Sequence, residues 1–212
     1  MLPKEIEEIF KEYSEDDYNL YITCVDYSTE KFTVSFSLDV DNINDKGVIN
    51  QKWTITAFGH RKNRLSFDFE PTIEVKAEHP LLWEYNDRQC QLYFNGQCKD
   101  VPKLFYDLYT IHKANFKHLK CFDISFGEGI AYFKPFHFSN GLLSEGSKTL
   151  MLKYGECLKQ NGMDYTILAE RPATYWDGEN HVPEKGDLKI LFFGKGFIIA
   201  KDFAFVLHEN SR

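Results

Sequence analysis

Apolar and polar side chains alternate along residues 32–39, which is the clearest periodic pattern in the chain. Every second residue there is Phe, Val or Leu, and Thr, Ser or Asp stands between them. Because successive side chains of a strand point to opposite faces, this pattern predicts a strand with one buried face. The alternation recurs over 53–57 and 65–69, with polar connections between the segments. Residues 18–76 are therefore predicted to form an antiparallel meander.

A helical period of three to four residues appears in three other segments. Residues 3–13 carry apolar side chains at helical spacing and predict a short amphipathic helix. A longer helix is expected after Asp100, a suitable N-cap, and its apolar rows continue to Phe116. A third helix is expected from about Ser144, with Gly162 as its stop signal. The two longer helices are expected to pack on one face of a sheet.

The predicted fold class is α+β, with mostly antiparallel, twisted sheets. From residue 90 the expected order is β-α-β-β-α-β plus a further hairpin, which is the order of the ferredoxin-like topology. The last strands, "LKILFF" and "FIIAKDFAFVL", are apolar enough to be expected in the centre of a sheet. No linker composition interrupts the chain. Residues 1–212 are therefore predicted to form one domain, with a helix and meander in 1–80 and an α+β part in 81–212.

The charge of the chain is acidic and unevenly distributed. The net charge is −7, and residues 1–80 hold 16 acidic and 9 basic side chains, whereas 81–212 hold 16 of each. An acidic surface repels phosphate backbones and anionic membranes, so nucleic acid is an unlikely partner and no membrane partner is expected. A protein partner with a basic surface is favoured. The oligomeric state is left open.

The cysteine pattern favours reduced thiols. The five cysteines are odd in number and include no CxxC pair, so neither a disulfide framework nor a zinc ribbon is predicted. No metal and no cofactor are expected. His112 lies in the apolar face of its predicted helix and is expected to be a hydrogen-bonded core histidine. The N-terminal segment has no signal-peptide core and no apolar run is long enough to span a bilayer, which favours a cytoplasmic protein.

The stretch "GLLSEGSKT" comes close to a phosphate-binding loop. Ser147 stands between the glycine and Lys148, whereas a Walker A loop requires the lysine directly after the glycine. A nucleotide cradle is therefore not predicted. A weaker possibility stays open: a helix start with Ser144, Ser147 and Lys148 can receive an anion on its free amides.

The loop "ATYWDGENHVPEKGD" holds the best local candidate for a site. Asp177, Glu179 and His181 fall at alternate positions and share one face if the backbone is extended. Two carboxylates and an imidazole can bind a divalent metal or perform acid–base chemistry. Tyr175 and Trp176 precede them, and exposed aromatic side chains are typical of binding surfaces.

These observations lead to two functional hypotheses. The absence of a recognisable catalytic constellation favours a non-enzymatic cytosolic binding protein that engages a protein partner. The alternative is a small-ligand-binding protein or a metal-assisted enzyme whose site lies near the 175–181 loop. No enzymatic activity is assigned.

Overall fold

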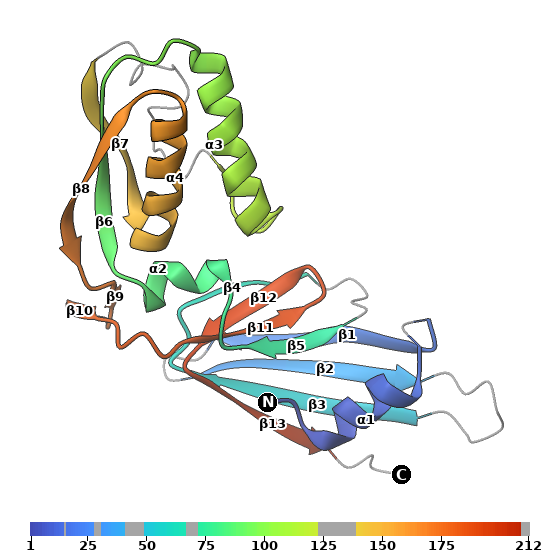
Figure 1. The fold of residues 1–212 in the computed structure, drawn as a ribbon. Coiled ribbons are helices and arrows are strands. Elements are labelled where there is room, and N and C mark those ends of the chain that lie inside the picture. The colour runs from blue at the N-terminus through green and yellow to red at the C-terminus, as the bar shows by residue number, and fades with distance from the viewer. Residues whose placement is uncertain (15, 28–30, 41–48, 67–71, 123–138, 209–212) are drawn as a thin grey trace. The chain divides into compact units, whose positions relative to one another are not determined.

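The computed structural model describes residues 1–14, 16–27, 31–40, 49–66, 72–122 and 139–208 (Figure 1). The fold is α+β with mostly antiparallel sheets, as the sequence predicts. The chain forms two compact units. The first combines Met1–Glu78 with Asp187–Arg212, and the second comprises His79–Gly186, so the second unit is inserted into the sequence of the first.

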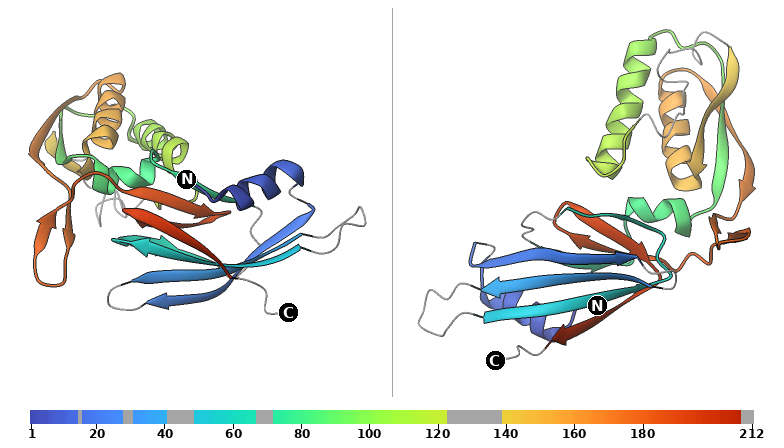
Figure 2. Two further views of the ribbon diagram at one scale, coloured as in Figure 1. Left: turned by 90° about the horizontal axis from the view of Figure 1, so that it is seen from below. Right: turned by 180° about the vertical axis from the view of Figure 1, so that it is seen from behind.

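In its described residues, the first unit contains one helix and two four-stranded sheets. Its elements are α1 (Lys4–Glu12), β1 (Tyr18–Tyr27), β2 (Phe32–Val40), β3 (Ile49–Phe58), β4 (Lys62–Arg64), β5 (Ile73–Lys76), β11 (Lys189–Phe193), β12 (Gly196–Ala200) and β13 (Asp202–His208). One sheet has the order β1-β2-β3-β13 and the other the order β4-β12-β11-β5, with every neighbouring pair antiparallel. Helix α1 and the second sheet cover the same face of the first sheet (Figure 2).

The period of two along β2 accounts for the core of this unit. All its alternate apolar residues are buried, and they pack with Ile6 of α1 and with Phe193 and Ile198 of the second sheet. The predicted meander is confirmed for β1, β2 and β3, which pair in sequence. It is wrong for the end of the segment: residues 62–64, expected in a polar connection, form β4, and β4 and β5 pair with the distant β12 and β11. The strand expected over 65–69 falls largely on residues 67–71, outside the described residues.

The C-terminal strands separate at Lys201, where the chain passes from one sheet to the other. The expectation of central strands is confirmed for β11 and β12, and every residue of β12 is buried. The expectation is wrong for β13, which lies at an edge of the first sheet and is only partly buried. Strands β12 and β13 are both apolar, but β12 has neighbouring strands on both sides, whereas β13 has one neighbour among the described strands, β3.

The described part of the second unit is built on a three-stranded sheet. Its elements are a 3-10 turn (Pro80–Leu82), α2 (Trp83–Asn86), β6 (Gln89–Asn95), α3 (Val101–Phe116), β7 (Asn140–Ser147), α4 (Lys148–Gln160), β8 (Asp164–Arg171), β9 (Thr174–Trp176) and β10 (His181–Pro183). The sheet order is β7-β6-β8, and β9 and β10 form a separate hairpin. Helices α3 and α4 lie on the same side of this sheet, with α4 against the strands and α3 against α4 (Figure 1).

One split β-α-β unit is present in this sheet. Strands β7 and β8 are both antiparallel to β6, which lies between them, and α4 connects them. A ferredoxin-like sheet requires a fourth strand between α3 and β7. The predicted hairpin in this part of the chain falls largely on residues 123–138, outside the described residues, so the ferredoxin-like topology stays a prediction.

The N-caps of α3 and α4 are an aspartate and a serine. Asp100 caps α3 by accepting a hydrogen bond from the Lys103 N–H at 3.0 Å, as predicted. The predicted helix start at Ser144 is wrong, because residues 140–147 form β7 and Ser147 is the N-cap of α4. Pairing with β6 keeps residues 144–147 in an extended conformation, so the helix begins only after Ser147.

His112 is a core histidine, as predicted. It is completely buried, with Nδ1 2.9 Å from the Tyr154 hydroxyl and Nε2 3.1 Å from the Lys120 carbonyl oxygen. Because a carbonyl oxygen only accepts, Nε2 carries a proton, and in the neutral imidazole Nδ1 then accepts from the Tyr154 hydroxyl. In the described ranges, no helix has the length and apolar character needed to cross a membrane.

Candidate functional site

The 175–181 loop forms the β9–β10 hairpin, in which Trp176 is paired with His181. Asp177 closes the turn: its N–H donates to the Asn180 carbonyl oxygen at 3.0 Å. Its carboxylate Oδ1 accepts the N–H groups of Asn180 at 2.7 Å and Glu179 at 2.9 Å. These two backbone donors lower the pKa of Asp177 from its ordinary value. Gly178, with φ +113°, supplies the left-handed position that the turn requires.

The hairpin presents an exposed aromatic side chain. Trp176 is 58% exposed, and its ring lies 5.2 Å from that of His181 at an interplanar angle of 63°. Tyr175 on the neighbouring position is half-buried. The structure therefore brings four of the predicted site residues, Tyr175, Trp176, Asp177 and His181, onto one short, hydrogen-bonded hairpin, and Glu179 lies in its turn.

The hairpin does not gather a metal-binding set of side chains. Within the described residues, no group of three or more His, Cys, Asp or Glu side chains is placed to hold a metal ion. In the hairpin, the Asp177 carboxylate is engaged by two backbone N–H groups and the His181 ring packs against Trp176. The hairpin is suited to recognition of a partner through the exposed Trp176 side chain, which is followed by two acidic residues in the turn.

The start of α4 already holds an anion from the protein itself. Thr149 N–H donates to the Asp87 carboxylate at 2.7 Å, and Leu150 N–H donates to the Ser147 hydroxyl at 3.4 Å. Lys148 N–H donates to the Arg88 carbonyl oxygen at 2.7 Å. Asp87 therefore occupies the position that a bound anion takes at a helix N-terminus.

The side chains that suggested an anion site are otherwise engaged. Ser144 and Ser147 are buried, and the Lys148 ammonium lies 2.7 Å from a Glu170 carboxylate oxygen. Arg88 pairs with the other Glu170 oxygen at 3.2 Å. Lys148, followed by Arg88, lowers the pKa of Glu170. This end of α4 is thus closed by a surface ion-pair network.

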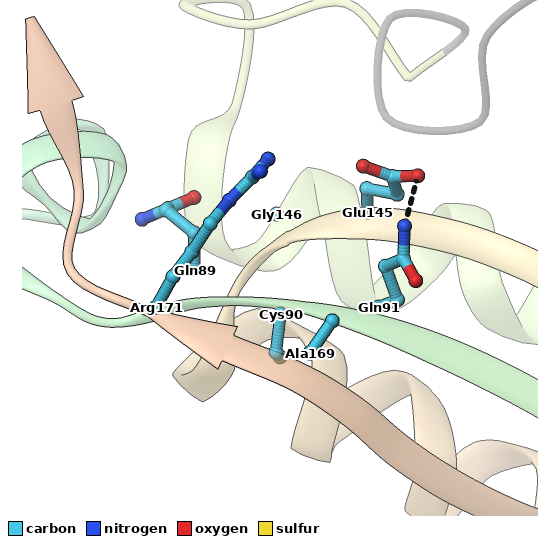
Figure 3. A pocket seen from close by; sticks show the side chains of 7 residues that line it. All are labelled: Gln89, Cys90, Gln91, Glu145, Gly146, Ala169 and Arg171. Atoms are coloured by element: carbon cyan, nitrogen blue, oxygen red, sulfur yellow. Dashed lines mark hydrogen bonds between the residues drawn. The ribbon is translucent and has the colours of Figure 1, made fainter. Parts of the chain in front are cut away.

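A small pocket lies on the strands next to this network. Its volume is about 200 Å³, and it is lined by Gln89, Cys90, Gln91, Glu145, Gly146, Ala169 and Arg171 (Figure 3). The Gln91 side-chain amide donates to Glu145 at 2.8 Å. Gln89, Gln91, Glu145 and Arg171 project from one side of the strands, so the pocket presents amides, a carboxylate and a guanidinium.

A bulge gives the pocket its shape. The pairing of β6 with β8 shifts between Gln89 and Gln91, so that two β8 residues stand opposite Cys90, and Ala169 has φ +54°. Burial raises the pKa of the Cys90 thiol, and Glu170 and Asp87 add to this rise. A buried thiol with a raised pKa is a poor nucleophile, so Cys90 contributes to the wall of the pocket.

The sequence pattern does not predict the pocket. Glu145 and Gly146 lie in the segment that is expected to start a helix, and Gln89 and Arg171 belong to strands that are distant in sequence. The bulge that joins them arises from strand pairing. In the sequence, the local sign of the pocket is the pair Gln89 and Gln91, which lie on the polar face of an alternating segment.

Comparisons with known proteins add no identification. No protein-family model matches the chain, and neither a curated protein nor a solved structure matches it significantly.

Proposed function

We propose that this protein is a non-enzymatic cytoplasmic binding protein that engages a protein partner through the β9–β10 hairpin. The observation that carries this proposal is the exposure of Trp176 on a turn that Asp177 holds in place. A tryptophan that is 58% exposed leaves a large apolar area in water. Burial against a partner removes this unfavourable contact with water.

The hairpin is preorganised for such a contact. Tryptophan is among the residues that contribute most to binding free energy when they fill a pocket on a partner. Trp176 is held by cross-strand pairing with His181 and precedes a hydrogen-bonded turn, so ordering it on binding has a low entropic cost. Little rearrangement of the hairpin backbone is therefore expected on binding.

The charge around Trp176 favours a basic partner. Residues 174–183 include Asp177 and Glu179 and contain neither Lys nor Arg. Both residues are exposed in the turn that follows Trp176. A partner surface with an apolar pocket rimmed by Lys or Arg complements this arrangement, and a nucleic-acid backbone does not.

The test compares the wild-type chain with Trp176→Ala in affinity capture from a cell extract, followed by reconstitution with the purified captured protein. Tyr106→Ala is the matched control, because Tyr106 is an aromatic residue of the same unit and is 67% exposed. Loss of Trp176 is expected to weaken the reconstituted complex about 30-fold or more, as for an interface hot spot. Tyr106→Ala is expected to leave the affinity unchanged. Equal affinities of all three chains contradict the proposed role of the hairpin.

A second candidate function is the binding of a small polar ligand in the pocket of β6, β7 and β8. Arg171 and Glu145 line the same volume, so a zwitterion such as a free amino acid fits its charges. Thermal-shift measurements with a panel of free amino acids test this candidate. A stabilisation that disappears in Arg171→Ala and persists in Trp176→Ala supports ligand binding at the pocket, and no shift with any amino acid argues against this candidate.

A further inference from the structure

Strand β13 forms one edge of the first sheet and carries five consecutive apolar residues, Phe203 to Leu207. Phe203 and Phe205 pack partly against the core, and Val206 and Leu207 are 52% and 41% exposed. The strand pairs with β3 over its whole length without a shift of register. In the described residues, the edge is thus regular and apolar, and the side chains of Val206 and Leu207 are exposed.

Other sheet edges in the described ranges carry features that discourage pairing with another chain. Strand β1, at the opposite edge of the same sheet, has an irregularity between Ile22 and Cys24. Strands β4 and β5 are short and carry charged side chains, and β7 and β8 each pair irregularly with β6. The strands of the β9–β10 hairpin have three residues each. Bulges, charges and short length are the usual protection of edge strands, and β13 has none of them between its ends.

The sequence of β13 is complementary to itself in the antiparallel direction. If Phe205 lies on a two-fold axis, Phe203 stands opposite Leu207 and Ala204 opposite Val206 of the second copy. At each end the Asp202 carboxylate, which also pairs with Lys189 at 2.9 Å, stands opposite the His208 imidazole. Nε2 of His208 lies 2.8 Å from the Thr54 hydroxyl, so a hydrogen bond to the carboxylate of the second copy comes from Nδ1. This register aligns all seven residues of the strand and keeps the inward side chains of both copies on the same face.

From this complementarity we propose that β13 is a homodimerisation strand. Two copies of the chain pair antiparallel at this edge, and their four-stranded sheets form one continuous sheet of eight strands. The pairing satisfies the outward backbone groups of β13 and brings the Phe203, Phe205 and Leu207 side chains of both copies together. It involves the first unit and is independent of the hairpin in the second unit.

The first experiment measures the mass of the purified full-length chain by sedimentation velocity over a wide concentration range. A concentration-dependent species of twice the single-chain mass is expected. A chain that sediments as a monomer at all concentrations up to the millimolar range overturns the proposal.

The second experiment tests the register with charge variants. His208→Glu places two like charges opposite each other in both end pairs and is expected to raise the dimer dissociation constant roughly tenfold. Adding Asp202→Lys in the double variant Asp202→Lys/His208→Glu creates opposite charges again and is expected to restore dimerisation. Val206→Lys, which introduces an edge lysine, is expected to weaken the dimer by a similar factor or more.

Leu152→Lys is the control, because Leu152 is 41% exposed on α4 in the other unit. It is expected to dimerise like the wild type, as is Trp176→Ala. Circular dichroism establishes that each variant is folded. A dimer that is insensitive to both Val206→Lys and His208→Glu, or a double variant as weak as His208→Glu alone, overturns the proposed pairing.

Discussion

At the scale of single residues, the buried polar pair of His112 and Tyr154 joins α3 to α4 by a hydrogen bond of 2.9 Å. The position of His112 in an apolar helical row predicts its burial, and this is confirmed. Its partner is not predictable from local pattern, because Tyr154 lies on the following helix and meets His112 only when α3 and α4 pack together. The same holds for Gln89 and Arg171, which line one pocket from two strands.

This pair supplies a stability prediction. Tyr154→Phe removes the hydroxyl that donates to His112 Nδ1 in the core, and we expect the free energy of unfolding to fall by about 1–2 kcal/mol. Tyr165→Phe is the control, because its hydroxyl donates to Glu156 at the surface, and a change below about 0.5 kcal/mol is expected. Urea unfolding followed by circular dichroism measures both. Equal losses in the two variants contradict a special contribution of the buried bond.

At the scale of elements, strands and helices are predictable where one period persists and a cap is unambiguous. The period of two persists along β2. Asp100 is an unambiguous cap at the start of α3. The segment from Ser144 to Ser147 has no unambiguous cap, because it offers two serines three residues apart, either of which can cap a helix. Strand pairing with β6 decides between them, and a local reading of the sequence contains no information on that pairing.

The start of α4 gives a prediction for Asp87. Its carboxylate accepts the Thr149 N–H, so Asp87→Ala removes a cap and a favourable charge at the helix N-terminus. We expect a loss of about 1–2 kcal/mol in the free energy of unfolding. Asp87→Asn keeps an acceptor and is expected to retain part of this stability. Thermal unfolding of both variants provides the measurement, and an unchanged midpoint in Asp87→Ala argues against this capping role.

At the scale of the whole molecule, the sequence predicts the α+β class and misses the way in which distant segments combine. Strands β4 and β5 are close to β3 in sequence, yet their sheet is completed by β11 and β12. The intervening residues 79–186 form a unit with its own sheet. The spacing of apolar residues within single elements cannot reveal such an insertion when no stretch of linker-like composition marks its ends. The organisation of residues 1–212 as one domain stays a prediction.

Truncation at Gly186 tests how the units depend on the C-terminal strands. The shortened chain lacks β11, β12 and β13, and with them the side chains of Phe193 and Ile198 that pack into the core of the first unit. Strand β2 then loses the apolar layer over its buried face, and the first unit is expected to unfold. The second unit keeps all its strands and helices and is expected to stay folded.

Hydrogen exchange measured by mass spectrometry distinguishes the two units in one experiment. In the full-length chain, amides of β2, β6 and α4 are expected to be protected. In the truncated chain, protection should be lost in β2 and kept in β6 and α4, since the hydrogen-bonded partners β7 and β8 of β6 are still present. Loss of protection in all three elements shows instead that the two units fold as one cooperative domain. Retained protection in β2 shows that α1, β1 and β3 suffice for the first sheet, which contradicts the core role assigned to β11 and β12.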